Sequence, residues 1–316
     1  MSRFLLNDAS LHGQFASLPP FLAALGVVFQ MRDAIQRSGF RLEVNRLVTQ
    51  RAVINTHTFH QVISRVPNPE IKRSVLSWLD KDGPFWDDPP VHSGNEYFEC
   101  EGEVVTGTAL AEACTLMALF AESSVLSLTP SKFSRNPLAV FWRDRADGDQ
   151  CWQIANFLSE PSLVAYLRNV EKPPASWRQL LDWTTINCPS LQLSPEILSQ
   201  LPTTFFSSAA QRAQVLFKAL HEINSALLSG DAKRFEELRR LWMEGDKARM
   251  TDSSDAEKAD FAAGLNFKHP VTQRVIACTW HAKIKTPQLR IHFEWPKQNP
   301  QDALFIAYFG PKLTKR

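Results

Sequence analysis

The strictest constraint on the fold of this chain is an alternation of polar and apolar residues that ends at Trp295. The polar members are Arg290, His292 and Glu294, and the apolar members are Leu289, Ile291, Phe293 and Trp295. Successive side chains of a β-strand point to opposite faces of the sheet. The pattern therefore predicts a strand with one packed apolar face and one polar face that is presented outward.

A second strand is expected just before it. The break at Thr286-Pro287 suits a turn, and pairing through that turn places His281, Lys283 and Lys285 on the same polar face. A further β-type run covers 304–309, and an earlier one covers 274–280. These runs predict a C-terminal antiparallel sheet of three or more strands.

The rest of the chain mixes both periodicities. Strands are expected at 3–7, 125–128 and 138–143, and a hairpin at 97–105. Helical spacing covers 21–37, 70–79, 108–121 and 207–228, and Asp231 is expected to cap one more helix. The fold class is thus predicted to be α+β, with an N-terminal α/β region, a helical middle and the C-terminal sheet. The expected domains are an α/β domain at 1–160, a helical region at 161–250 and a basic antiparallel β domain at 251–316.

The charge of the chain is distributed unevenly. From Phe267 to Arg316 there are nine Lys and Arg side chains against two acids, a formal charge of +7. Because the whole chain carries +2, residues 1–266 carry −5. A general attraction to nucleic acid is therefore not expected, and any contact with phosphate should be local to this basic tail.

Several classes of protein are disfavoured by the composition. Five widely spaced Cys without a C-x-x-C pair indicate reduced thiols, which is typical of a cytoplasmic protein. Neither a secretory signal nor an uninterrupted membrane-spanning run is recognisable, so no membrane partner is expected. The sequence has no nucleophile elbow, P-loop or dinucleotide-binding motif, and we expect no cofactor.

Basic and imidazole groups on one sheet face can support metal-free RNA cleavage. A cation can stabilise the charge of a pentacoordinate phosphate, and a His can take or give the proton. Residues 245–316, with strands bearing Lys, Arg and His and an aromatic on the last strand, resemble RelE-type ribonuclease toxins and the wider barnase, EndoU and colicin nuclease group. The resemblance implies that Arg290 stabilises the transition state and that His281 or His292 is the acid or base.

The same resemblance assigns the other site residues. Tyr308 on the last strand would stack on a base or donate a hydrogen bond. The expected phosphate-binding residues are Lys283, Lys285, Lys312, Lys315 and Arg316. An ordinary solvated basic face on an antiparallel sheet is the structural alternative.

The N-terminal region offers an alternative site. Asp8 follows the first expected strand and Glu112 lies on a strongly apolar helix. These two carboxylates resemble the spaced acids of PIN-type nucleases, and that resemblance implies a hard divalent metal between them. Since the later aspartates of that family are not recognisable, no metal is the preferred expectation.

The sequence leads to two hypotheses of function. The first is a cytosolic nucleic-acid-acting protein, a metal-independent toxin-like endoribonuclease of bacterial stress or phage defence. The second is a non-catalytic subunit of a multi-protein defence assembly, which docks RNA, DNA or an acidic protein partner through its basic C-terminal sheet. The sequence leaves open whether the chain is an enzyme.

Overall fold

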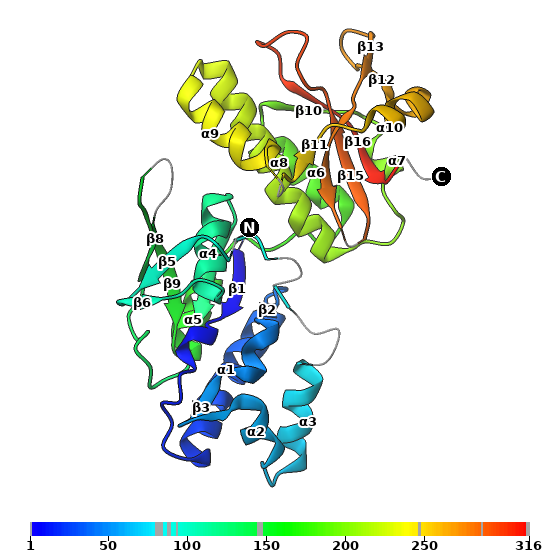
Figure 1. Cartoon of the computed structure of the whole chain (residues 1–316). Coiled ribbons are helices and arrows are strands. Elements are labelled where there is room, and N and C mark those ends of the chain that lie inside the picture. Colours follow the sequence, from blue (N-terminus) through cyan, green and yellow to red (C-terminus); the bar gives the residue numbers. More distant parts are fainter. Residues whose placement is uncertain are drawn as a thin grey trace. The chain divides into compact units, whose positions relative to one another are not determined.

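Two compact units make up the chain, one formed by residues 1–172 and the other by residues 173–316. The computed structural model describes residues 2–79, 85–86, 90–92, 94–143, 148–245, 248–285 and 287–313 (Figure 1). Each unit has a main β-sheet and its own helices. We describe the two units separately.

The first unit is organised around a seven-stranded sheet of order β2-β1-β7-β9-β8-β5-β6. Its strands are β1 (Ser2–Leu6), β2 (Leu42–Glu43), β5 (Tyr97–Cys100), β6 (Glu103–Val104), β7 (Glu122–Leu126), β8 (Leu138–Arg143) and β9 (Gln150–Phe157). The first four in sheet order are parallel, whereas β8, β5 and β6 are joined by antiparallel pairing. The polar residue that follows β1, Asp8, consequently lies at the carboxyl edge of the parallel part.

The helices described for the first unit are labelled in Figure 1. They are α1 (Leu18–Arg37), α2 (Phe59–Ser64), α3 (Pro69–Trp78), α4 (Ala109–Ala118) and α5 (Glu160–Leu167). Shorter elements are the 3-10 turns η1 (Asp8–Ser10) and η2 (Arg46–Gln50) and the small hairpin of β3 (Ala52–Ile54) and β4 (His57–Thr58). The predicted helices at 21–37, 70–79 and 108–121 are thus present, with ends displaced by a few residues.

Helix α1 is a core helix of the first unit. It begins with a Pro-Pro pair inside its first turn, and its inward face includes Phe21, Leu25, Val28 and Ile35, all buried. In the described residues, α1 is also the one helix whose length and apolar composition would allow it to cross a membrane. A third of this apolar stretch is buried, and the buried face packs in the main core of the unit.

The second unit contains a five-stranded sheet of order β10-β16-β15-β14-β11. Its strands are β10 (Leu191–Leu193), β11 (Met250–Thr251), β14 (Trp280–Ile284), β15 (Leu289–Phe293) and β16 (Leu304–Pro311). A separate two-stranded hairpin consists of β12 (Asn266–Lys268) and β13 (Val275–Ala277), preceded by the 3-10 turn η3 (Ala262–Leu265). β10 joins β16 in parallel, and the other pairings are antiparallel.

The helices described for this unit are α6 (Trp177–Asn187), α7 (Ile197–Gln200), α8 (Ser207–Ser229), α9 (Ala232–Met243) and α10 (Asp255–Asp260). Helix α8 packs on the apolar face of the sheet, where Phe217 meets Phe309 of β16 with ring centroids 5.7 Å apart. Helix α8 is terminated by Gly230, whose backbone adopts the left-handed conformation. The next helix, α9, is capped by Asp231, whose side chain accepts a hydrogen bond from the backbone N–H of Arg234 as predicted.

The α+β fold class, the helical middle and the C-terminal antiparallel sheet are confirmed. The helical region 161–250 and the basic strands, which the sequence analysis separated, lie largely in one unit because α8 and β10 both pack with β16. The run 274–280 proves to be two elements: β13 belongs to the small hairpin, and β14 begins only at Trp280. Residues after Cys278 enter the main sheet.

Candidate nucleic-acid interface

The predicted site residues of the C-terminal sheet lie in two neighbouring rows across β14, β15 and β16. The first row is His281, His292 and Tyr308, and the second is Lys283, Arg290 and Gly310. Each row is a set of direct cross-strand partners. The structure therefore brings His281, His292, Arg290 and Tyr308 onto one face, as the alternation predicts.

The two histidines form a buried pair. Their ring centroids are 5.1 Å apart, and His292 and His281 are 2% and 7% exposed. Burial lowers the pKa of each imidazole to about 4; for His281 the neighbouring His292 acts in the same direction. The Nδ1 of His292 lies 3.0 Å from the carbonyl oxygen of Cys278, so this nitrogen carries the proton and donates it to that oxygen. Both rings are therefore neutral at neutral pH.

Tyr308 completes the row with a hydroxyl that already has a partner. Its O–H donates to the carbonyl oxygen of Pro311 at 2.7 Å, and burial raises the pKa of the phenol to about 12. The hydroxyl occupies the space above Gly310, where an added Cβ would lie 2.5 Å from it. The carbonyl oxygen of Gln200 would lie 2.6 Å from the same Cβ, so Tyr308 and Gln200 together leave room only for glycine at position 310.

The polar face of the sheet that carries these rows is covered at the histidines. The expectation that this face is presented outward is therefore wrong at His281 and His292. Phe267 of β12 lies over both His292 and Tyr308, with ring centroids 6.4 and 6.2 Å away. Around it, a small apolar cluster of Ile276, Cys278, Phe305 and Ala307 closes this part of the sheet. The cover comes from the hairpin β12–β13, which the alternation within a single strand cannot reveal.

Lys283 and Arg290 lie at the other end of the same face, and Lys285 and Lys312 follow the ends of β14 and β16 near them. Lys283 and Lys285 are exposed, and Arg290 and Lys312 are half-buried. The pKa of Lys283 is lowered mainly by desolvation and next by the charge of Arg290. The charges of Lys285 and Lys312 also lower this pKa. We call these four residues the cationic cluster: Lys283, Lys285, Arg290 and Lys312.

Glu257 of α10 neutralises part of this charge. Its carboxylate lies 3.0 Å from the Nζ of Lys312 and also acts on Lys283 and Arg290. With four cations and this acid, the cluster retains a net charge of about +3. The sequence analysis missed Glu257 because α10 is far from the strands in sequence. Lys315 and Arg316, also expected to bind phosphate, lie outside the described residues.

Arg290 occupies the centre of the cationic cluster. One of its terminal nitrogens donates to the carbonyl oxygens of Leu289, at 2.9 Å, and Ile284, at 3.3 Å. Its Nε is buried without a hydrogen-bond partner in the described part of the protein. Buried donors are nearly always satisfied, so this unpaired Nε adds to the cost of holding Arg290 in the cluster.

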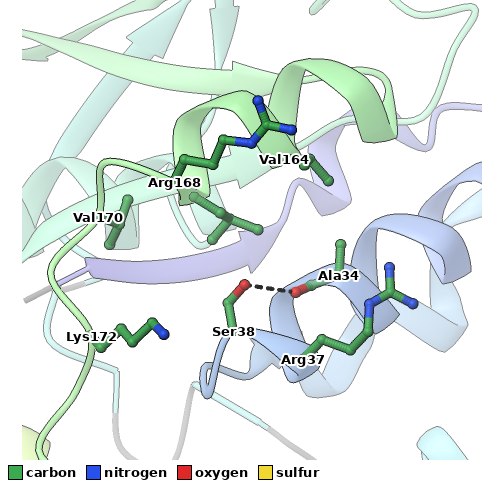
Figure 2. Close-up of a pocket in the computed structure, with 8 residues that line it drawn as sticks. Ala34, Arg37, Ser38, Val164, Arg168, Val170 and Lys172 are labelled. Atoms are coloured by element: carbon green, nitrogen blue, oxygen red, sulfur yellow. Dashed lines mark hydrogen bonds between the residues drawn. The ribbon is translucent and has the colours of Figure 1, made fainter.

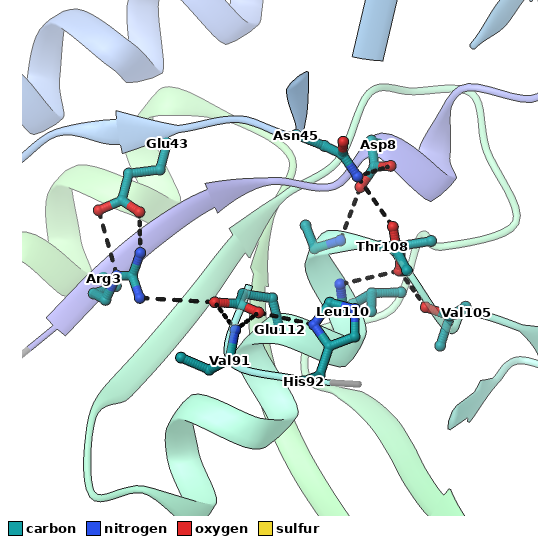
Figure 3. A network of polar contacts seen from close by, with 12 residues as sticks. Arg3, Asp8, Glu43, Asn45, Val91, His92, Val105, Thr108, Leu110 and Glu112 are labelled. Atoms are coloured by element: carbon teal, nitrogen blue, oxygen red, sulfur yellow. Dashed lines mark hydrogen bonds and ion pairs between the residues drawn. The ribbon is translucent and has the colours of Figure 1, made fainter. Parts of the chain in front are cut away.

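The alternative acidic residues lie in the first unit and are each engaged with cations or donors (Figure 3). Asp8 accepts from Arg51 at 2.7 Å, from Asn45 at 3.2 Å and from the backbone N–H of Ala109 at 2.8 Å. Burial raises the pKa of Asp8, and Arg51 and the Ala109 N–H oppose that shift.

Glu112 has its own partners, as Figure 3 shows. It lies 2.8 Å from the Nδ1 of His92, accepts from the backbone N–H of Val91 at 3.0 Å, and is 4.0 Å from an Arg3 nitrogen. Across the described ranges, no three His, Cys, Asp or Glu side chains gather in a group that could hold a metal ion. The oxygens expected for a divalent metal are thus taken up by hydrogen bonds and ion pairs.

Comparisons of the chain with protein-family models, curated proteins and solved structures found no match.

Proposed function

We propose that this protein binds nucleic acid through the cationic cluster of its second unit, as a non-catalytic subunit of a larger assembly. The observation that carries the proposal is the direct cross-strand pairing of Lys283 with Arg290. Like charges placed opposite each other in a sheet destabilise it, whereas a row of cations suits the phosphates of a nucleic-acid backbone. The exposure of Lys283 and Lys285 beside this pair supports the same conclusion.

The geometry favours binding over cleavage for a specific reason. A general acid or base must reach the reacting oxygen within hydrogen-bond distance, and its pKa should lie near the working pH. His292 is covered by Phe267, His281 is buried beside it, and burial lowers the pKa of both to about 4. The accessible groups of this face are the cations, which can hold phosphate without performing proton transfer.

A metal-independent endoribonuclease of bacterial stress or phage defence is the second candidate. One observation favours it: two imidazoles 5.1 Å apart lie in the row next to Arg290 on the same face. This function requires the hairpin β12–β13 to move away from His292 when substrate binds. Once uncovered, a neutral imidazole would serve as a base, and Arg290 would stabilise the phosphate charge.

The decisive experiment measures binding of fluorescent single-stranded RNA, single-stranded DNA and duplexes to the full chain by anisotropy. We expect the double variant Lys283→Gln/Lys285→Gln to bind at least about tenfold more weakly. The matched control is Lys233→Gln/Arg240→Gln on α9, which removes the same charge elsewhere in the unit. Equal weakening in both variants would show that net charge alone is responsible and would exclude the cluster as the interface.

Salt provides a second criterion. Four phosphate contacts should weaken binding by about two orders of magnitude between roughly 50 and 200 mM salt. The double variant should reduce the slope of log affinity against log salt by about 1.4–1.8. Point substitutions are needed here because a chain ending near Gly264 would lose β14 to β16, the strands on which α8 packs.

The same samples separate the two candidates. After incubation, the RNA is run on a denaturing gel with wild type, Arg290→Ala and His292→Ala. Intact RNA with wild type supports the binding subunit. RNA that is cut by wild type, but not by a His292→Ala variant that still binds it, supports the endoribonuclease. If the purified chain carries an acidic protein bound at the cationic cluster and no nucleic acid, the cluster is a docking surface for that protein.

A further inference from the structure

A pocket of about 420 Å³ in the first unit is lined by residues that belong to neither candidate site described above. It is formed where α1 ends, beside the end of α5 and the segment that follows α5 (Figure 2). At about 30 Å³ for each molecule of liquid water, this volume corresponds to roughly 14 waters. It is thus larger than a single small ion requires and falls in the range of small-molecule sites.

The pocket combines an apolar wall with a rim of positive charge. The apolar residues are Ala34, Val164, Leu167 and Val170, and the cations are Arg37, Arg168 and Lys172 (Figure 2). The Ser38 hydroxyl also lines the pocket and donates to the carbonyl oxygen of Ala34 at 3.1 Å, so its oxygen remains able to accept. These features suit a ligand with an apolar body and an anionic group.

Helix ends explain only part of this charge. Arg37 is in the last turn of α1 and Arg168 caps α5, where cations interact favourably with the helix dipole. Lys172 lies outside any helix, so the dipole does not account for it. Arg37 has an acidic neighbour, since Glu160 lies 3.3 Å from one of its nitrogens.

The two remaining cations form no such ion pair in the part of the chain that the structure describes. Among the described residues, neither the Arg168 nor the Lys172 side chain forms a hydrogen bond or an ion pair. The three lining cations are accompanied by Glu160 and by Glu171, which lies between Val170 and Lys172 in the chain, so the net charge around the hollow is about +1. Arg can bind a phosphate through two parallel N–H donors, and Lys binds it as a point charge.

We propose that this pocket binds a small phosphorylated molecule with an apolar or aromatic body, the chemical class of the nucleoside monophosphates. Arg168 and Lys172 hold the phosphate, and Val164, Leu167 and Val170 pack against the body. The site is separate from the cationic cluster, which lies in the other unit. The first unit thereby acquires a ligand-binding role of its own.

The test uses isothermal titration calorimetry on the full chain with AMP as the probe. Adenosine supplies the body without the phosphate, and inorganic phosphate supplies the anion without the body. We expect one saturable AMP site per chain with a Kd below about 1 mM, and at least about tenfold weaker binding of each fragment. No saturable AMP binding would overturn the proposal, and so would equal binding of inorganic phosphate.

Two variants test the residues. Arg168→Gln/Lys172→Gln should weaken AMP binding by at least about tenfold, since each charged hydrogen bond contributes on that scale. The matched control, Arg65→Gln/Arg73→Gln, removes two exposed cations from the α2–α3 region of the same unit and should bind AMP as wild type does. Unchanged affinity in the first variant would place the AMP site elsewhere.

A third variant leaves the charge unaltered. Val170→Trp fills the hollow with an indole and should abolish AMP binding while the far-ultraviolet circular dichroism stays unchanged. Lys283→Gln/Lys285→Gln should leave AMP binding intact. Loss of AMP binding in this last variant would place the AMP site at the cationic cluster and would refute the proposed AMP site in the pocket. RNA binding through the cluster is tested separately, by the anisotropy experiment.

Discussion

Lys283 of β14 and Arg290 of β15 are direct partners across an antiparallel pair, so two cations lie opposite each other at the end of the sheet. Such a pair opposes folding because like charges on facing strands repel. Desolvation of both side chains adds to the cost, as the lowered pKa of Lys283 and of Arg290 indicates. This arrangement is understandable if the second unit binds an anion at this point.

The first prediction is that function and stability change in opposite directions at Lys283. Lys283→Gln should raise the free energy of unfolding by roughly 0.2–1 kcal/mol, because the charge facing Arg290 is removed. The same substitution should weaken RNA binding several-fold. Urea denaturation and anisotropy on one protein sample measure both effects. The outcome that contradicts this account is a variant that loses stability together with affinity.

The strands of this site were predictable because their information is local. The alternation at 289–295 and the Thr286-Pro287 break define two strands and their facing residues without reference to the rest of the chain. β15 and its partner β14 follow that pattern, and the site residues share a face as expected. Local periodicity therefore sufficed for the rows across the sheet.

What covers the rows was not predictable in the same way. Phe267 reaches His292 and Tyr308 from a different hairpin, and β10 joins β16 from far earlier in the chain. The sequence also has no signal for the break between β13 and β14, because residues 274–280 have the pattern of a single β-type run. Burial of a polar face depends on such non-local contacts, which is why the accessibility of the histidines was misjudged.

The second prediction concerns pH. In the unfolded chain a His titrates near 6.5, whereas burial lowers the pKa of His281 and of His292 to about 4 in the folded protein. The unfolded state therefore binds more protons between these values, and stability must fall as the pH falls through this range. Each His should contribute up to about 1.4 kcal/mol of lost stability per pH unit, and the contribution should vanish above about pH 8.

Urea denaturation at pH 7, 6 and 5 measures this dependence. His281→Gln should make the loss of stability between pH 7 and 5 smaller, because one proton-binding group is removed from the unfolded chain. His60→Gln in α2 of the first unit is the control. The surrounding charges of Arg290 and Lys283 disfavour the imidazolium of His281 and are retained in both variants. An identical pH dependence in wild type and His281→Gln would refute the buried neutral pair.

The third prediction concerns the close approach of Tyr308 to Gly310. In Gly310→Ala the new Cβ would lie 2.5 Å from the Tyr308 hydroxyl and 2.6 Å from the carbonyl oxygen of Gln200. We expect a loss of about 1–3 kcal/mol, the range for overpacking a core. Tyr308→Phe alone should cost about 1 kcal/mol, because the hydrogen bond to Pro311 is lost.

The double variant Gly310→Ala/Tyr308→Phe should be more stable than the sum of the single losses predicts, because one of the three close contacts is removed. The ring carbon that carried the hydroxyl and the Gln200 carbonyl oxygen still lie 2.7 and 2.6 Å from the new Cβ, so the relief is partial. Thermal denaturation of wild type, the two single variants and the double variant gives the coupling free energy. Strict additivity would mean that the Gln200 carbonyl, rather than the Tyr308 hydroxyl, is what makes glycine necessary.

The last prediction concerns Asp8, the acid that binds Arg51 and the first turn of α4. Asp8→Ala removes the acceptor of the buried Ala109 N–H and of two Arg51 donors, and should destabilise the first unit by about 2–4 kcal/mol. Asp8→Asn keeps one oxygen for the Ala109 N–H and should cost less. Asp33→Asn, at an exposed acid on α1, should change stability by less than about 0.5 kcal/mol.

Urea denaturation with and without Mg²⁺ distinguishes a structural Asp8 from a metal ligand. Because the Asp8 oxygens are held by Arg51, Asn45 and Ala109, Mg²⁺ should stabilise wild type and Asp8→Asn equally little. A ligand that binds only the folded state raises stability with its concentration, so a true metal site would show a rise in wild type that Asp8→Asn lacks. RNA binding should remain unchanged in every Asp8 variant, since the cationic cluster belongs to the other unit.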